Sequence, residues 1–246
     1  MIRSKRLLKL TVLAMMVALG VIISPILRFE GMCPMAHFIN ITCSVLLGPW
    51  YSLLCATLIG IIRMVLMGIP PLALTGAVFG AFLSGILYRL SKGKLIFAVL
   101  GEIIGTGFIG AVVSYPVMTL LWGKEGLTWL FYIPSFVCGT LIGGSIAFVF
   151  LKKLASSGLL KKFQNMLNTQ AYDDNSGVLS NAVSIAAFGV ISYLVIEILT
   201  GIFNIKSLIW TYVSFSALGA FILGGIIYFI IQTVSKKTKK AEQIDS

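Results

Sequence analysis

The stretch FINITCSVLLGPWYSLLCATLIGIIRMVLM, residues 38–67, is apolar over most of its length and carries one break, at Gly48-Pro49. Proline lacks a backbone N–H and clashes with the preceding helical turn, and a Gly-Pro pair is typical of a turn. The stretch therefore predicts two short helices joined by a tight turn at Gly48–Tyr51. Both helices are apolar enough to lie within a membrane.

The rest of the chain has the same character. Of its 246 residues, 58% are apolar and only 11% are charged, against about 25% charged in soluble domains. Apolar runs on either side of residues 38–67 predict further membrane spans at about Leu10–Leu27, Pro71–Leu90, Leu95–Leu121, Thr128–Leu151, Val178–Phe203 and Ser207–Thr233. Together the spans predict an all-α integral membrane protein with short loops. This leaves no room for a soluble catalytic domain or an ATPase module.

The composition changes after the sixth predicted span. Residues 154–177, which include Lys161, Lys162, Asp173 and Asp174, predict a polar cytoplasmic linker with room for a short amphipathic helix. We therefore expect four parts in the chain. These are a six-helix membrane domain at residues 1–153, the linker, two additional transmembrane helices at residues 178–235, and a basic cytoplasmic tail at residues 236–246.

The net charge of +11 is distributed unevenly over the loops. Lys and Arg gather before the first span, at Arg89–Lys94, in the linker and in the tail, whereas the opposite side has only Arg28, Lys124 and Lys206. Because cytoplasmic loops retain Lys and Arg, this asymmetry predicts a multi-pass protein of the cell membrane with both termini cytoplasmic. The basic residues flank spans and do not line one face, so we expect no nucleic-acid partner.

Motifs for metal binding, nucleotide binding and catalysis are missing from the sequence. Its four cysteines show no C-x-x-C spacing, and it contains no G-x-x-x-x-G-K-[ST] segment to hold a nucleotide. His37 is the only histidine and precedes the candidate serines, so a serine and histidine intramembrane protease would lack its base. We therefore expect no metal, no cofactor and no enzymatic activity. Any coupling to ATP must then come from partner subunits.

Polar side chains inside the predicted spans gather at one depth. A polar group in the bilayer costs a few kcal/mol unless it is paired or faces water, and a helix rises about 1.5 Å per residue. Counting this rise from each turn places hydrogen-bonding and aromatic groups from five spans in one layer toward the outer surface. The candidate substrate-binding residues of this layer are His37, Asn40, Arg63, Thr75, Ser114, Tyr115 and Tyr132. Aromatic walls with a few directed polar groups are typical of a pocket for a small, flat molecule.

Simpler roles are open to several of these residues. Tyr132 has the position of an interfacial aromatic residue, and His37 that of a solvated loop residue. Arg63 needs a partner or a cavity, because it lies far from either end of its span. The nearest unpaired acid is Glu102, about 12 Å from the inner face by the same rise and therefore nearer the cytoplasm than Arg63. We expect Glu102 to be a structural partner more than a ligand residue.

Glycines four residues apart occur in three neighbouring spans, as Gly76 and Gly80, Gly101 and Gly105, and Gly139 and Gly143. Small residues at this spacing let helices approach closely. The three spans are therefore expected to pack tightly together.

Six short segments of the chain occur in an order typical of one family. They are, in chain order, His37–Asn40, Leu46–Tyr51, Gly60–Arg63, Gly85–Arg89, Gly101–Gly107 and Ser114–Pro116. Through them, residues 1 to about 153 resemble the substrate-binding S component of an energy-coupling factor (ECF) vitamin transporter, most closely the thiazole family ThiW.

This resemblance implies a six-helix membrane protein that captures hydroxyethylthiazole, the thiazole precursor of thiamine, and delivers it inward. It also implies partners, namely an ECF transmembrane scaffold subunit and two cytoplasmic ATPase subunits. In the wider group the first helix contacts the scaffold through small residues, which correspond here to Ala14 and Ala18. The spans at residues 178–235 have no counterpart in the six-helix pattern.

Other functions stay open on the sequence alone. The same fold would serve as the S component for another vitamin or precursor. Alternatively, the chain is a membrane interaction protein without transport, in which residues 178–235 bind a partner and the outer polar layer is a helix interface. An intramembrane enzyme ranks below both.

Overall fold

The computed structural model describes residues 2–26, 33–172, 177–202 and 207–242 of the chain. Every regular element among them is a helix, and seven of these helices are long and apolar enough to cross a membrane. The prediction of an all-α integral membrane protein is therefore confirmed. The chain forms two compact units, Met1–Asp174 and Asn175–Ser246, and each is described by itself.

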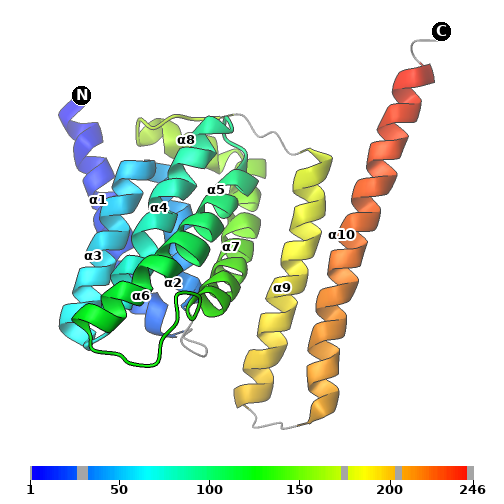
Figure 1. The fold of residues 1–246 in the computed structure, drawn as a ribbon. Helices are drawn as coiled ribbons and strands as arrows, with labels where there is room; N and C mark the ends of the chain where they lie inside the picture. Colours follow the sequence, from blue (N-terminus) through cyan, green and yellow to red (C-terminus); the bar gives the residue numbers. More distant parts are fainter. Residues whose placement is uncertain (1, 27–32, 173–176, 203–206, 243–246) are drawn as a thin grey trace. The chain divides into compact units, whose positions relative to one another are not determined.

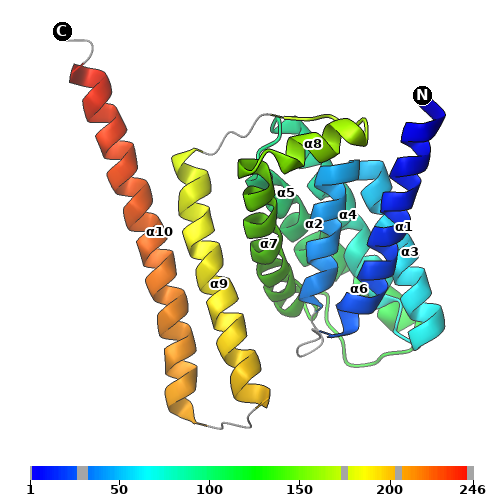
Figure 2. The same ribbon diagram turned by 180° about the vertical axis from the view of Figure 1, so that it is seen from behind.

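The first unit is a bundle of helices that run up and down, with one short helix, α8, across one end (Figures 1 and 2). Its elements are α1 (Ile2–Ile26), α2 (Pro34–Leu47), α3 (Pro49–Met67), α4 (Leu72–Leu90), α5 (Leu95–Glu102), η1 (Ile103–Gly110), α6 (Ala111–Pro116), η2 (Val117–Leu121), α7 (Ile133–Ser156) and α8 (Leu159–Met166).

The predicted break at Gly48-Pro49 is confirmed as the junction of α2 and α3. Gly48 ends α2 with a φ of 92°, which a residue with a Cβ rarely adopts, and Pro49 stands in the first turn of α3, where its missing N–H costs nothing. Helix α4 passes close to this turn, because a Cβ on Gly85 would lie 2.6 Å from Pro49 Cα.

Helix α2 is the centre of the first unit. Twelve of its 14 residues are buried, and it packs against α1, α3, α4, α5, α7 and α8. At about 1.5 Å per residue, 14 residues reach about 21 Å, which is less than the hydrocarbon core of about 30 Å. The predicted second span is therefore a short interior helix. Its first turn already lies inside the bundle, since Pro34 and His37 are buried.

The predicted span at Leu95–Leu121 is one continuous helical rod of 27 residues. Two stretches of it, η1 and η2, are π-helical and therefore wider than an α-helix. The rod and α4 touch backbone to backbone, because a Cβ on Gly105 would lie 2.5 Å from Gly80 Cα. The expected tight packing of these two spans is thus confirmed. Helix α7 packs against the rod as well, although its Gly143 approaches Pro34 at the start of α2.

The predicted span at Thr128–Leu151 begins and ends later than expected. Helix α7 starts at Ile133, with Pro134 in its first turn, and continues to Ser156. Residues 129–132 form turns before it. The aromatic residues there extended the apolar pattern beyond the helix, so the sequence placed its start too early.

Helix α8 closes the end of the bundle at which α2 ends. Gln164 is fully buried and donates hydrogen bonds to Val45 O at 3.0 Å and to Tyr88 Oη at 3.1 Å. Thr169 donates to Leu46 O at 2.9 Å. The last carbonyl groups of a helix lack hydrogen-bond donors within that helix. The side chains of Gln164 and Thr169 are such donors for the end of α2. Residues up to 172 of the predicted linker thus pack on the bundle.

The second unit contains α9 (Val178–Ile202) and α10 (Leu208–Glu242), which pack against each other. Ser214 donates a hydrogen bond of 2.7 Å to Glu197 Oε1, and Asn181 donates one of 3.2 Å to Tyr228 Oη, so polar contacts join the two helices. Parts of several predicted features lie outside the described residues: Leu27, Arg28, Asp173, Asp174, Phe203, Lys206 and residues 243–246 of the tail.

Candidate functional site

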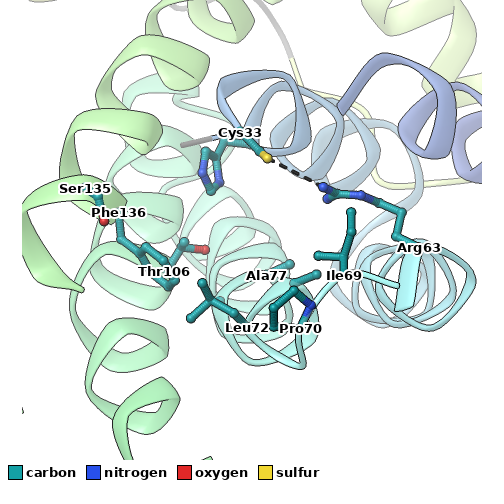
Figure 3. A pocket seen from close by; sticks show the side chains of 12 residues that line it. Cys33, Arg63, Ile69, Pro70, Leu72, Ala77, Thr106, Ser135 and Phe136 are labelled. Carbon is teal, nitrogen blue, oxygen red and sulfur yellow. Dashed lines mark hydrogen bonds between the residues drawn. The ribbon is translucent and has the colours of Figure 1, made fainter. Parts of the chain in front are cut away.

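A cavity opens in the first unit where α3 ends and where α4 and α7 begin (Figure 3). Its polar lining residues are Cys33, His37, Arg63, Thr106 and Ser135. Its apolar wall is made by Ile69, Pro70, Leu72 and Phe136 together with small residues of α4. The space inside it that a water-sized sphere can reach is about 90 Å³, which is below the range of about 300–1,000 Å³ typical of small-molecule sites.

A buried carboxylate lies behind the His37 side of this cavity. Glu102 is fully buried, and its Oε1 is 2.9 Å from His37 Nδ1, 3.0 Å from Asn40 Nδ2 and 3.1 Å from Thr106 Oγ1. Because Asn40 and Thr106 donate to Oε1, this oxygen is an acceptor, and His37 donates to it through Nδ1–H. His37 Nε2 is then the ring nitrogen left for a molecule in the cavity.

The position of Glu102 corrects the depth expected from the sequence. Counting residues placed Glu102 nearer the cytoplasm than the His37 layer, yet the two side chains are in direct contact. The count assumed that α2 begins at the outer surface, whereas its first turn is inside the bundle. Gly80 also makes room for the carboxylate, since a Cβ there would lie 2.8 Å from Glu102 Oε2.

Arg63 is buried beside the same cavity without an acidic partner among the described residues. The residue is 4% exposed, its Nη2 donates to Cys33 Sγ at 3.5 Å, and its Nε has no hydrogen-bond acceptor in the part of the chain that the structure describes. An ion pair between Arg63 and Glu102, one of the simpler roles open on the sequence, is wrong. Glu102 instead contacts His37, with Oε1 2.9 Å from Nδ1.

The other sequence-predicted residues lie near the cavity but do not line it. Thr75 and Ser114 share a hydrogen bond of 2.6 Å that joins α4 to α6. Tyr115 packs against Trp129, with the ring centroids 4.4 Å apart and the ring planes tilted by 43°. Tyr132 is buried, its hydroxyl has no hydrogen-bond partner among the described residues, and this burial raises the pKa of its phenol.

Tyr132 is connected to the cavity through one neighbour. Its ring centroid is 5.8 Å from that of Phe136, which lines the cavity wall. The structure therefore brings His37 and Arg63 to one cavity, with Asn40 in the network behind His37, and leaves the remaining four candidates outside the lining.

Several lining residues were not predicted from the sequence. Nothing in the sequence indicates that Phe136 and Thr106 line a cavity, because apolar and small polar residues occur all along membrane helices. The nearest signal was the glycine spacing on α4, since a Cβ on Gly76 would lie 2.8 Å from the Phe136 ring. Gly76 thus lets Phe136 close one side of the cavity.

Ala14 and Ala18 lie on another surface of the first unit. Both are exposed on α1 and line a shallow apolar groove between α1 and α3, together with Leu10, Val21, Leu58 and Ile62. The groove is separate from the cavity and shares none of its lining residues.

An all-helical bundle with several helices of membrane-crossing length defines a multi-pass membrane protein, and its cavity lies at one end of the bundle. The family model for the thiamine-precursor transporter protein (ThiW) matches residues 10–157, and the chain belongs to this family. No curated protein and no solved structure matches the chain.

Proposed function

We propose that the chain is the substrate-binding subunit of an ECF-type importer that takes up hydroxyethylthiazole, with ATP hydrolysis supplied by partner subunits. The observation that carries this proposal is the cavity at His37 and Arg63 in a member of a thiamine-precursor transporter family. Its apolar wall suits a small ring, and its few polar groups suit a hydroxyl or a ring nitrogen.

The side chains have distinct roles in this proposal. His37 presents Nε2 to the ligand, and Glu102 and Asn40 hold the imidazole in place through their shared hydrogen-bond network. Phe136 and Leu72 form walls for the heteroaromatic ring. Thr75, Ser114, Tyr115 and Tyr132 act indirectly, by holding α4, α6 and the start of α7 together around the mouth of the cavity.

The proposed orientation has the mouth of the cavity outside the cell. Lys92 and Lys94 lie in the turn between α4 and α5. Figure 1 shows that this turn is at the end of the bundle opposite the end of α3 and the start of α7, whose residues line the cavity. Lys9 is at that same end, because its Nζ donates to Asn168 O at 3.2 Å. Since basic loops stay in the cytoplasm, both termini are assigned to the inside and the cavity faces outward.

The groove on α1 is the proposed contact with the ECF scaffold. Ala14 and Ala18 leave the backbone of α1 accessible, and a partner helix packs closely on small residues at this spacing. This contact would join the binding subunit to the scaffold and its two ATPase subunits.

Calorimetric titration of the purified chain tests the proposal, with hydroxyethylthiazole, thiamine, hydroxymethylpyrimidine and riboflavin as ligands. We expect saturable binding of hydroxyethylthiazole alone. Replacing both His37 and Asn40 by alanine is expected to weaken binding by at least about tenfold, because the hydrogen bond to the ligand and the network behind it are both lost. Asn165→Ala, on the exposed face of α8, is the control.

Each alternative function has its own outcome in this titration. Saturable binding of a different member of the panel would keep the importer and replace its ligand. Folded protein that binds none of the four would contradict the proposal and favour a membrane interaction protein.

A further inference from the structure

The guanidinium group of Arg63 is a buried positive charge that faces a cavity. The residue is 4% exposed, and the contact it makes is with a thiol, which is a weak acceptor. Nε has no acceptor at all among the described residues. A charge held in a membrane protein in this way is costly unless a counter-charge reaches it.

The acid nearest to this layer of the bundle does not neutralise Arg63. The Oε1 atom of Glu102 accepts from His37, Asn40 and Thr106, and no carboxylate of the described residues, Glu102 included, lies within 4.0 Å of the guanidinium. The counter-charge is therefore expected to arrive with a molecule that enters the cavity.

Arg63 and Phe136 lie at opposite ends of the cavity. Figure 3 shows the guanidinium group of Arg63 at one end, and Phe136 with Ser135 at the other. A guanidinium group donates two parallel hydrogen bonds to an oxyanion such as phosphate or carboxylate, which a neutral hydroxyl cannot accept in the same way. A matching ligand has a ring at one end and an oxyanion at the other.

We propose that Arg63 recognises an oxyanion on the transported molecule, so that the cavity prefers the phosphate monoester of a small heteroaromatic alcohol to the alcohol itself. This inference rests on the proposed function, because it requires the cavity to be the ligand site. It assigns a charge to the ligand, which membership of the family does not specify. For a thiazole precursor, the preferred form is hydroxyethylthiazole phosphate.

The test compares two ligands on matched variants of the full-length chain, in a detergent free of phospholipid. Hydroxyethylthiazole and hydroxyethylthiazole phosphate are titrated into the wild type, Arg63→Gln and Arg63→Lys, with inorganic phosphate and thiazoleacetic acid as further probes. We expect the wild type to bind the phosphate ester at least about tenfold more tightly than the alcohol. Arg63→Gln loses this preference, and Arg63→Lys keeps part of it because lysine offers charge without the paired donors.

Arg89→Gln is the matched control, because Arg89 is exposed at the opposite end of the bundle. It is expected to keep the preference for the ester. If thiazoleacetic acid and the phosphate ester both bind more tightly than the alcohol and by the same factor, the site recognises oxyanions in general. If only the ester binds more tightly than the alcohol, the site is specific for phosphate. Both results support the proposal.

Two outcomes would overturn the inference. The first is a wild type that binds the alcohol as tightly as the ester, and the second is a preference that survives in Arg63→Gln. In both the proposed function stands, provided that the alcohol binds. Folded wild type that binds neither ligand would instead contradict the proposed function itself.

Discussion

One carboxylate oxygen of Glu102 accepts hydrogen bonds from three side chains on two segments, α2 and η1. The sequence did place His37 and Asn40 on one helix face, because residues three apart on a helix are neighbours. It could not place Glu102 against them, since the depth of α2 in the bundle depends on packing with six other helices. A buried acid is visible in a sequence, whereas its partners are visible only in the fold.

Glu102→Gln is expected to lower the free energy of unfolding by about 1–3 kcal/mol, because charge-assisted hydrogen bonds in a buried site become neutral ones. Ligand binding should weaken as well, since the imidazole of His37 loses its fixed orientation. The measurements are thermal unfolding and calorimetric titration. Glu125→Gln changes an exposed acid in the same way and should leave both unchanged. A Glu102→Gln variant with wild-type stability would show that the network contributes little.

Helices α2 and α8 show what the sequence predicts for single elements. The end of α2 and the start of α3 followed from Gly48-Pro49, because glycine and proline act locally on the backbone. The docking of α8 did not follow, although an amphipathic helix was expected there. Gln164 has no local signal for its role, since its partners Val45 and Tyr88 are far away in the chain.

Gln164→Leu is expected to destabilise the first unit by about 1–3 kcal/mol, because Val45 O and Tyr88 Oη lose a buried donor. The measurement is the midpoint of thermal unfolding in detergent. Gln170→Leu makes the identical change at an exposed position just after α8 and is the control. An equal loss of stability in the two variants would contradict the role assigned to Gln164.

At the level of the whole chain, the structure groups residues differently from the predicted parts. The sequence separated residues 154–177 as a linker because they are polar, but the described part of that segment up to residue 172 packs on the first unit, which runs to Asp174. Composition reveals which residues avoid lipid, and it does not reveal that polar residues such as Gln164 and Thr169 complete the end of a helix. The all-helical membrane fold, in contrast, followed directly from hydropathy.

Two truncations test how the parts of the chain depend on one another. A chain ending at residue 177 keeps the whole first unit and is expected to bind hydroxyethylthiazole as the full chain does. A chain ending at residue 153 lacks α8 and should unfold at a lower temperature and bind less ligand, because the carbonyl groups at the end of α2 lose their donors. Size-exclusion chromatography, thermal unfolding and titration provide the measurements. Loss of binding in the longer chain would assign part of the site to the second unit.

Orientation is tested through Cys33, which lines the cavity, whereas Cys43 and Cys55 are fully buried. In a Cys138→Ser background, a membrane-impermeant maleimide added to intact cells is expected to label Cys33, and hydroxyethylthiazole should slow the labelling. Mass spectrometry of the purified chain measures both effects. Labelling only after the cells are permeabilised would place the cavity on the cytoplasmic side.

The shortness of α2 has a consequence for how the protein is made. A translocon releases a segment into lipid when that segment is long and apolar enough by itself, and the 14 residues of α2, with His37 and Asn40 among them, are a poor candidate. We expect α2 to enter the bilayer together with α3, as a hairpin closed at Gly48-Pro49, and to reach its final place only after α4 and α7 have been synthesised. Biogenesis would then finish with the helix at the centre of the bundle.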